Sequence, residues 1–130
     1  MSALASYVAD NWIKPESNRT AILSAITGEP VAETGTTVRD FAAMLNYARQ
    51  VGGSALRVLT FHQRAKMLKA LAEAIMARKE ELYELSYETG ATRADGWIDI
   101  EGGAGTLFAY SSKGRRELPN DTIQIGRAHV

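Results

Sequence analysis

The sequence contains no cysteine. This absence excludes disulfides, a thiolate nucleophile and any cysteine-based metal site within the chain. Histidine is nearly as scarce, with only His62 and His129, so a histidine-rich metal site is not expected either. Serines are present, but neither histidine has the partners that a nucleophilic serine needs. The residues themselves therefore predict neither a catalytic centre nor a metal centre.

Excess charge and long apolar runs are also missing. Fifteen basic and fifteen acidic side chains cancel, which gives no electrostatic reason to expect nucleic acid or an anionic membrane as a partner. No apolar stretch is long enough to cross a bilayer, and residues 1–10 do not resemble a secretory signal. With 45% hydrophobic and 23% charged residues, the composition is that of a small soluble domain. We therefore expect a cytoplasmic protein.

The first third of the chain has the pattern of short strands and turns. Three segments are candidate strands, namely residues 6–13, 20–26 and 31–34. Residues 27–30, Thr-Gly-Glu-Pro, predict a turn between the last two of these strands. Pro15 and the polar run 16–19 predict a loop between the first two.

From position 37 onward the apolar spacing becomes helical. Thr37, with Asp40 three residues later, predicts a capped helix start. Gly52 and Gly53 predict the end of this helix, because glycine accepts the left-handed conformation found there.

Two further residue pairs have the spacing of a capping box and open two more helical segments: Thr60 with Gln63, and Thr92 with Asp95. The apolar face of the second segment continues toward Gly90, which we expect to stop it. The third segment fades near Gly114, and Pro119 predicts an extended stretch after it.

The predicted architecture is a β-hairpin region followed by three or four amphipathic helices. Each helix has an apolar stripe that must be buried, yet the chain offers little sheet to bury it against. We therefore expect these helices to cover a sheet that lies outside this sequence. The residues alone indicate an incomplete soluble α/β domain, and a self-sufficient helical interaction module is the alternative.

Residues 101–106, Glu-Gly-Gly-Ala-Gly-Thr, are rich in glycine. A dinucleotide-binding G-x-G-x-x-G motif would need glycine where Phe108 stands, and no strand precedes the run. Each glycine inside a helix costs about 1 kcal/mol relative to alanine. Three glycines within four residues therefore suggest either close packing of a neighbouring element or a role beside a ligand tunnel.

Several charged and aromatic residues carry weaker predictions. A basic cluster at the end of the third segment suits the helix dipole, with phosphate binding as the alternative: Lys113, Arg115 and Arg116. Three acidic residues are expected to be solvated or capping carboxylates: Asp95, Asp99 and Glu101. His62, in a first helical turn, is expected at the surface or near the cap. Trp12 and Trp97 are expected to be hydrophobic anchors.

Two stretches resemble the N-terminal region of the aldehyde dehydrogenase family. Residues 25–29, Ala-Ile-Thr-Gly-Glu, resemble an early turn between strands, and residues 64–90 resemble the helix pair that precedes the cofactor site. Residues 82–122, LYELSYETGATRADGWIDIEGGAGTLFAYSSKGRRELPNDT, are similar to one branch of the family. Members of that branch join an aldehyde dehydrogenase domain to an enoyl-CoA-hydratase-like domain and open a ring in phenylacetate degradation.

The resemblance implies an α/β parent with the Rossmann-like aldehyde dehydrogenase fold, to which residues 1–124 contribute an incomplete N-terminal part. It implies that the complete protein is a homo-oligomer that uses NAD or NADP to oxidise a CoA-linked semialdehyde, with oxepin-CoA hydrolysis as a further activity. An aldehyde dehydrogenase without a hydratase domain is the alternative. The catalytic cysteine, asparagine and glutamate of the family map onto no position here, which implies an inactive chain. By position, Ile100 and Gly103 are implied to line the substrate tunnel.

Residues 125–130, Ile-Gly-Arg-Ala-His-Val, depart from the family. They resemble the translation of a common sequencing adapter. We therefore expect these six residues to be an artefact of an incomplete gene read, which leaves His129 without a biological role.

Overall fold

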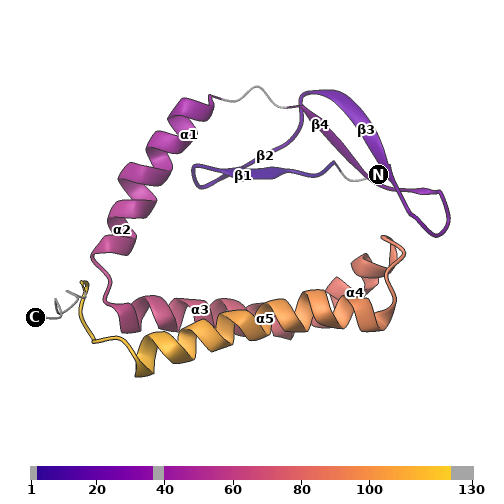
Figure 1. Cartoon of the computed structure of the whole chain (residues 1–130). Coiled ribbons are helices and arrows are strands. Elements are labelled where there is room, and N and C mark those ends of the chain that lie inside the picture. The colour runs from indigo at the N-terminus through magenta and orange to yellow at the C-terminus, as the bar shows by residue number, and fades with distance from the viewer. Residues whose placement is uncertain (1–2, 37–39, 124–130) are drawn as a thin grey trace, which may run out of the picture.

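The computed structural model describes residues 3–36 and 40–123. Strands are followed by a series of helices, as predicted, and the strands form two pairs (Figure 1). The strands are β1 (Ser6–Val8), β2 (Asn11–Ile13), β3 (Ser17–Leu23) and β4 (Pro30–Thr36). The helical elements are α1 (Phe41–Tyr47), the π-helical turn η1 (Ala48–Gly52), α2 (Gly53–Arg57), α3 (Phe61–Ala77), α4 (Lys79–Tyr87) and α5 (Arg93–Arg116).

β1 and β2 form an antiparallel hairpin in which Tyr7 lies opposite Trp12. The prediction of a single strand over residues 6–13 is wrong, because the chain reverses direction at Ala9 and Asp10. Their φ angles are 47° and 67°, the two positive values that a type I′ turn requires. Alanine is not a usual residue for such a turn, so the turn could not be recognised from the residue types.

β3 and β4 form a second antiparallel pair, with Ile22 opposite Ala32. The predicted pairing of two strands around residues 27–30 is confirmed. Gly28 lies in this turn with a φ of 73°, a conformation that glycine adopts without strain. β3 begins three residues earlier than predicted, so the loop predicted over residues 16–19 is wrong for all but its first residue.

The first helical segment continues through its two glycines. Asp40 caps α1 by accepting a hydrogen bond of 2.9 Å from a first-turn amide, and residues 41–57 then stay helical through η1 into α2. The predicted end at Gly52 and Gly53 is wrong, since both have a φ of −63°. Glycine permits a left-handed helix end but does not enforce one. Thr37, the predicted cap, lies outside the described residues.

α3 begins at the predicted capping box. The Gln63 amide donates to Thr60 Oγ1 at 3.2 Å, and the Thr60 amide donates to Gln63 Oε1 at 2.8 Å. The apolar face that continues toward Gly90 is divided between two helices, because Arg78 has φ −112° and ψ 16°. Gly90 follows α4 with a φ of 83°, which confirms it as the stop.

α5 also begins at its predicted capping box. The Thr92 amide donates to Asp95 Oδ2 at 3.0 Å, and the Asp95 amide donates to Thr92 Oγ1 at 3.3 Å. The helix ends at Arg116, two residues beyond Gly114, near which it was predicted to fade.

The segment after α5 folds back over the start of α3. The Phe61 amide donates to the Asp121 carbonyl at 2.8 Å. The extended stretch predicted after Pro119 is wrong, because residues 120–122 form bends. Hydrogen bonds to the α3 cap pull this stretch out of an extended path.

α3 and α5 pack side by side, and α4 lies against the first part of α5 (Figure 1). Small residues permit this approach. The buried residues of these three helices are Ala65, Ala72, Tyr83, Gly96, Ala104 and Ser111. A Cβ atom added to Gly114 would lie 3.1 Å from the Cβ of Ala65, so a larger residue would push α3 and α5 apart.

Most large apolar side chains of the described residues have no core to enter. Trp12 is 73% exposed and Trp97 is 56% exposed, so the prediction that they act as anchors is wrong within this part of the chain. The strands of residues 3–36 form only two antiparallel pairs. The predicted imbalance between apolar helix faces and available sheet is therefore present.

Candidate functional site

The two residues assigned to a tunnel wall, Ile100 and Gly103, lie on neighbouring turns of α5. Ile100 is half-buried and Gly103 is exposed. A Cβ atom at Gly103 would meet no atom within 4 Å, so this position faces open space in the described part of the chain. Their role in a tunnel stays a prediction.

The stretch of α5 from residue 102 to 105, which we call the glycine turn, is not where a neighbouring helix comes closest. Gly105 would also meet no atom within 4 Å if it carried a Cβ atom, and Gly102 would meet only backbone at 4.0 Å. The close approaches lie elsewhere on α5, at Gly114 against α3 and at Gly96 against α4, where a Cβ atom would lie 3.1 Å from the ring of Tyr83. Packing against the described helices therefore does not explain the glycine turn.

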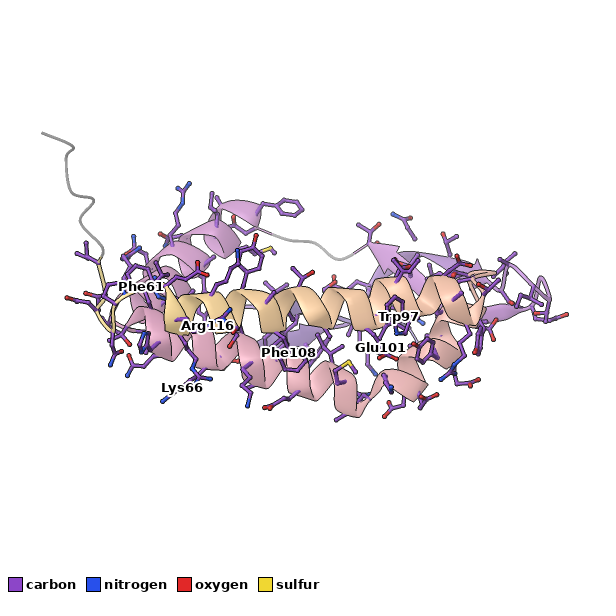
Figure 2. All side chains as sticks on the ribbon, turned by 60° about the horizontal axis from the view of Figure 1, so that its bottom comes forward. Phe61, Lys66, Trp97, Glu101, Phe108 and Arg116 are labelled. Carbon is purple, nitrogen blue, oxygen red and sulfur yellow. The ribbon has the colours of Figure 1, made fainter. Side chains whose placement is uncertain are left out.

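Beside the glycine turn, three side chains form what we call the α4–α5 polar cluster: Lys79, Tyr83 and Glu101. Glu101 accepts a hydrogen bond from the Tyr83 hydroxyl at 2.9 Å and pairs with Lys79 Nζ at 3.1 Å. Figure 2 shows Glu101 on the edge of α5 that faces the other helices. The prediction of a solvated or capping carboxylate is confirmed for Asp95 and Asp99 but is wrong for Glu101.

The polar cluster has a defined electrostatic character. Burial and the hydrogen bond to Glu101 raise the pKa of Tyr83. The hydrogen bonds from Tyr83 and Lys79 lower the pKa of Glu101. Arg93 covers the Tyr83 ring at 4.2 Å from its centroid and also pairs with Glu80 at 3.2 Å. Both pKa values move further from neutrality, so the tyrosine is neutral and the glutamate is charged at neutral pH, which suits a structural contact rather than proton transfer.

At the other end of α5, this helix and α3 enclose an open groove of about 520 Å³. Its lining is basic and hydroxyl-bearing, and we call it the basic groove: His62, Lys69, Phe108, Ser111, Ser112, Arg115 and Arg116. Figure 2 shows Phe108 and Arg116 on α5 and Lys66 on α3 toward this end of the helix pair. The predicted basic cluster is confirmed at the end of α5. Two of its members line the groove.

The basic groove carries positive charge that the described residues do not neutralise. Lys69 pairs with Glu73 at 3.0 Å, whereas no ion pair of Arg115 or Arg116 occurs within residues 3–36 and 40–123. His62 lies at the start of α3 as predicted, with Nε2 2.9 Å from a backbone carbonyl of the returning segment. Such a groove attracts anions. Sequence analysis missed Lys69, although its spacing of seven residues from His62 places both on one helix face.

The described residues contain no recognisable catalytic centre. They hold no group of three or more side chains suited to a metal ion. Their strands are antiparallel and the glycine turn lies inside α5, so they do not fit a dinucleotide cofactor, which binds at a strand-to-helix turn. Among the helices described, none combines the length and apolar character needed to cross a bilayer.

Comparisons with known proteins identify the family. The model of the aldehyde dehydrogenase family matches residues 12–130. A curated relative from Aromatoleum evansii, named 3,4-dehydroadipyl-CoA semialdehyde dehydrogenase, is 34% identical over 113 residues. The alignment covers 86% of this chain and 22% of the relative, so the chain spans less than a quarter of that protein's length. With the family model matching nearly all of its length, this chain belongs to the aldehyde dehydrogenase family.

Proposed function

We propose that this chain is part of an NAD(P)-dependent enzyme that oxidises a CoA-linked semialdehyde to the acid. The family match over residues 12–130 carries the proposal, and the name of the relative supports the CoA-linked substrate. In this proposal residues 1–124 form the N-terminal part of a domain with a Rossmann-like fold. NAD or NADP binds to the part of the complete protein outside these residues. The complete protein is a cytoplasmic homo-oligomer. Residues 125–130, which resemble an adapter translation, lie outside the described residues.

The chain alone is inactive in this proposal. It has no cysteine to attack an aldehyde carbonyl, and its described residues do not fit a dinucleotide. Its contribution is to cover a sheet with the apolar faces of its helices and to supply one wall of the substrate tunnel from Ile100 and Gly103. The exposed apolar side chains of the described residues support the proposal that these helices cover a sheet.

The basic groove supports a substrate linked to coenzyme A, because coenzyme A carries phosphate groups. Lys69, Arg115 and Arg116 supply cations there, and Ser111 and Ser112 supply hydroxyl donors. Arginine binds phosphate through paired hydrogen bonds, which gives direction as well as attraction. We therefore place the phosphate-bearing end of the substrate in the basic groove.

Two branches of the family fit this proposal. In the first, a hydratase-like domain follows, and the protein also hydrolyses oxepin-CoA in phenylacetate degradation. In the second, no hydratase domain follows, and the substrate resembles the one in the name of the Aromatoleum relative. Reading the gene past codon 124 separates the two, because only the first branch encodes a hydratase-like domain after the dehydrogenase cysteine.

The activity test uses the complete gene product. A CoA-linked semialdehyde and the same aldehyde without CoA are each supplied with NAD and with NADP. We expect reduced cofactor to form, and to form faster with the CoA-linked substrate. Failure to reduce either cofactor with any aldehyde would refute the proposal.

The tunnel wall is tested in the same protein. Gly103→Leu fills the position and is expected to slow the CoA-linked semialdehyde more than a short aldehyde. Gly105→Leu is the matched control, because it is also open in the structure but lies on a different face of α5. Equal slowing of both aldehydes by Gly103→Leu would remove Ile100 and Gly103 from the tunnel.

A further inference from the structure

The glycine turn is the stretch of α5 with the least intrinsic helix stability. Gly102, Gly103 and Gly105 all have low helix propensity. Thr106 Oγ1 donates to the Gly102 carbonyl at 3.2 Å, and such a bond to a helix carbonyl weakens and bends helices. No atom of the described residues fills the space beside Gly103 or Gly105. The turn therefore needs support from outside its own backbone to hold a fixed shape.

The α4–α5 polar cluster supplies that support on the side that faces α4. Glu101 immediately precedes the glycine turn and is bound to both Tyr83 and Lys79. Its side chain is only 22% exposed. The Tyr83 ring is fully buried and in contact with α5 at Gly96, so the hydroxyl that Glu101 accepts from is held in place.

A buried residue inside the glycine turn also fixes its position. Ala104, between the glycines, is buried, whereas Gly103 beside it is exposed. One face of the turn is therefore fixed against neighbouring helices while the other is open. Ile100 and Gly103 lie one turn apart on α5, and Glu101 lies on a different face, which the polar cluster holds against α4.

We infer that the α4–α5 polar cluster is a positioning device: Glu101, held by Tyr83 and Lys79, fixes the glycine turn and thereby the surface that Ile100 and Gly103 present to the substrate. The three cluster residues are positioning residues and do not touch the substrate themselves. The part that concerns substrate rests on the proposed function, whereas the part that concerns the shape of α5 does not.

Hydrogen exchange of the complete protein tests the shape of α5. Tyr83→Phe removes only the hydroxyl and keeps the ring against Gly96, and Glu101→Gln removes the charge. We expect the amides of residues 102–107 to exchange faster in both variants, by on the order of tenfold for Tyr83→Phe, with the amides of α3 unchanged. Glu81→Gln is the matched control, because it breaks an exposed ion pair between α4 and the preceding Arg78 and leaves α5 untouched. Unchanged exchange of residues 102–107 in Tyr83→Phe would overturn the inference.

Steady-state kinetics test the consequence for substrate. Tyr83→Phe is expected to raise KM for the CoA-linked semialdehyde several-fold, with kcat and the kinetics of a short aldehyde unchanged, and Glu81→Gln is expected to change neither. Equal loss of kcat for both aldehydes, or no change, would overturn the positioning role. A complete wild-type protein without any aldehyde activity would instead refute the proposed function, and the exchange data would then decide the inference alone.

Discussion

The ring of Tyr83 crowds any side chain at Gly96, since a Cβ atom there would lie 3.1 Å from the ring Cδ1 and the ring would have to shift by a few tenths of an ångström. The ring cannot move aside easily, because it is buried and its hydroxyl is bound to Glu101. We expect Gly96→Ala to lower the free energy of unfolding of the complete protein by about 1–3 kcal/mol, the usual effect of overpacking a core. Thermal unfolding followed by circular dichroism measures it.

Gly105→Ala is the control for this change. It makes the same substitution in the same helix, but a Cβ atom there meets nothing within 4 Å. We expect it to raise the thermal midpoint, because alanine favours a helix over glycine by about 1 kcal/mol. A stabilising Gly96→Ala would contradict the close approach of α4 to α5.

The polar cluster predicts how the attachment of α4 to α5 depends on pH. The pKa of Glu101 is lowered by Tyr83 and Lys79, so its contribution to stability is complete above about pH 4. That contribution is lost as the pH falls through the lowered value. The pKa of Tyr83 is raised by burial and by Glu101, so its contribution is complete below about pH 10. It is lost as the pH rises through the raised value.

Thermal midpoints of the complete protein across this range measure the effect. We expect a flat response near neutrality. Glu101→Gln is expected to reduce the fall in midpoint at acid pH, because the variant has no carboxylate to protonate at this contact. If the thermal midpoint fell equally at acid pH in the wild type and the variant, Glu101 would not stabilise the attachment of α4 to α5.

The basic groove predicts a charge-specific effect on substrate binding. Arg115→Ala and Arg116→Ala are each expected to raise KM for a CoA-linked semialdehyde by on the order of tenfold, the effect of losing a hydrogen bond to a charged group. A short aldehyde without CoA is expected to keep its KM. Lys113→Ala is the matched control, because it removes the same charge from the same helix end but does not line the groove. Equal effects of all three variants would indicate a general electrostatic attraction and not a specific binding site in the basic groove.

The starts of α3 and α5 could be predicted because they depend on neighbouring residues. In each, a threonine and a side chain three residues later satisfy the first free amides of the helix, as at Thr60 and Thr92. Gly52 and Gly53 show the limit of such local signals. Glycine allows a helix to end, but the chain continues there through a π-helical turn, and no nearby residue decides between the two outcomes.

The candidate site depended on contacts that the sequence does not reveal. Glu101 was expected to be a solvated or capping carboxylate, like Asp95 and Asp99, yet its partners Tyr83 and Lys79 stand 18 and 22 residues earlier. These contacts depend on the close packing of α4 against α5 at Gly96. The basic groove likewise joins Lys69 of α3 to a cluster at the far end of α5. The packing of helices sets both arrangements, and side-chain spacing within one helix does not determine that packing.

The behaviour of the 130-residue chain on its own bears most directly on the proposal that its helices are built to cover a sheet supplied by the rest of an aldehyde dehydrogenase. The measurement is a thermal melt by circular dichroism, combined with binding of a dye that reports exposed apolar surface and an aldehyde assay with NAD and NADP. We predict a broad, non-cooperative melt, strong dye binding and no cofactor reduction. A compact chain that melts cooperatively would instead indicate a self-sufficient helical module, and one that also oxidised an aldehyde unaided would contradict the proposal outright.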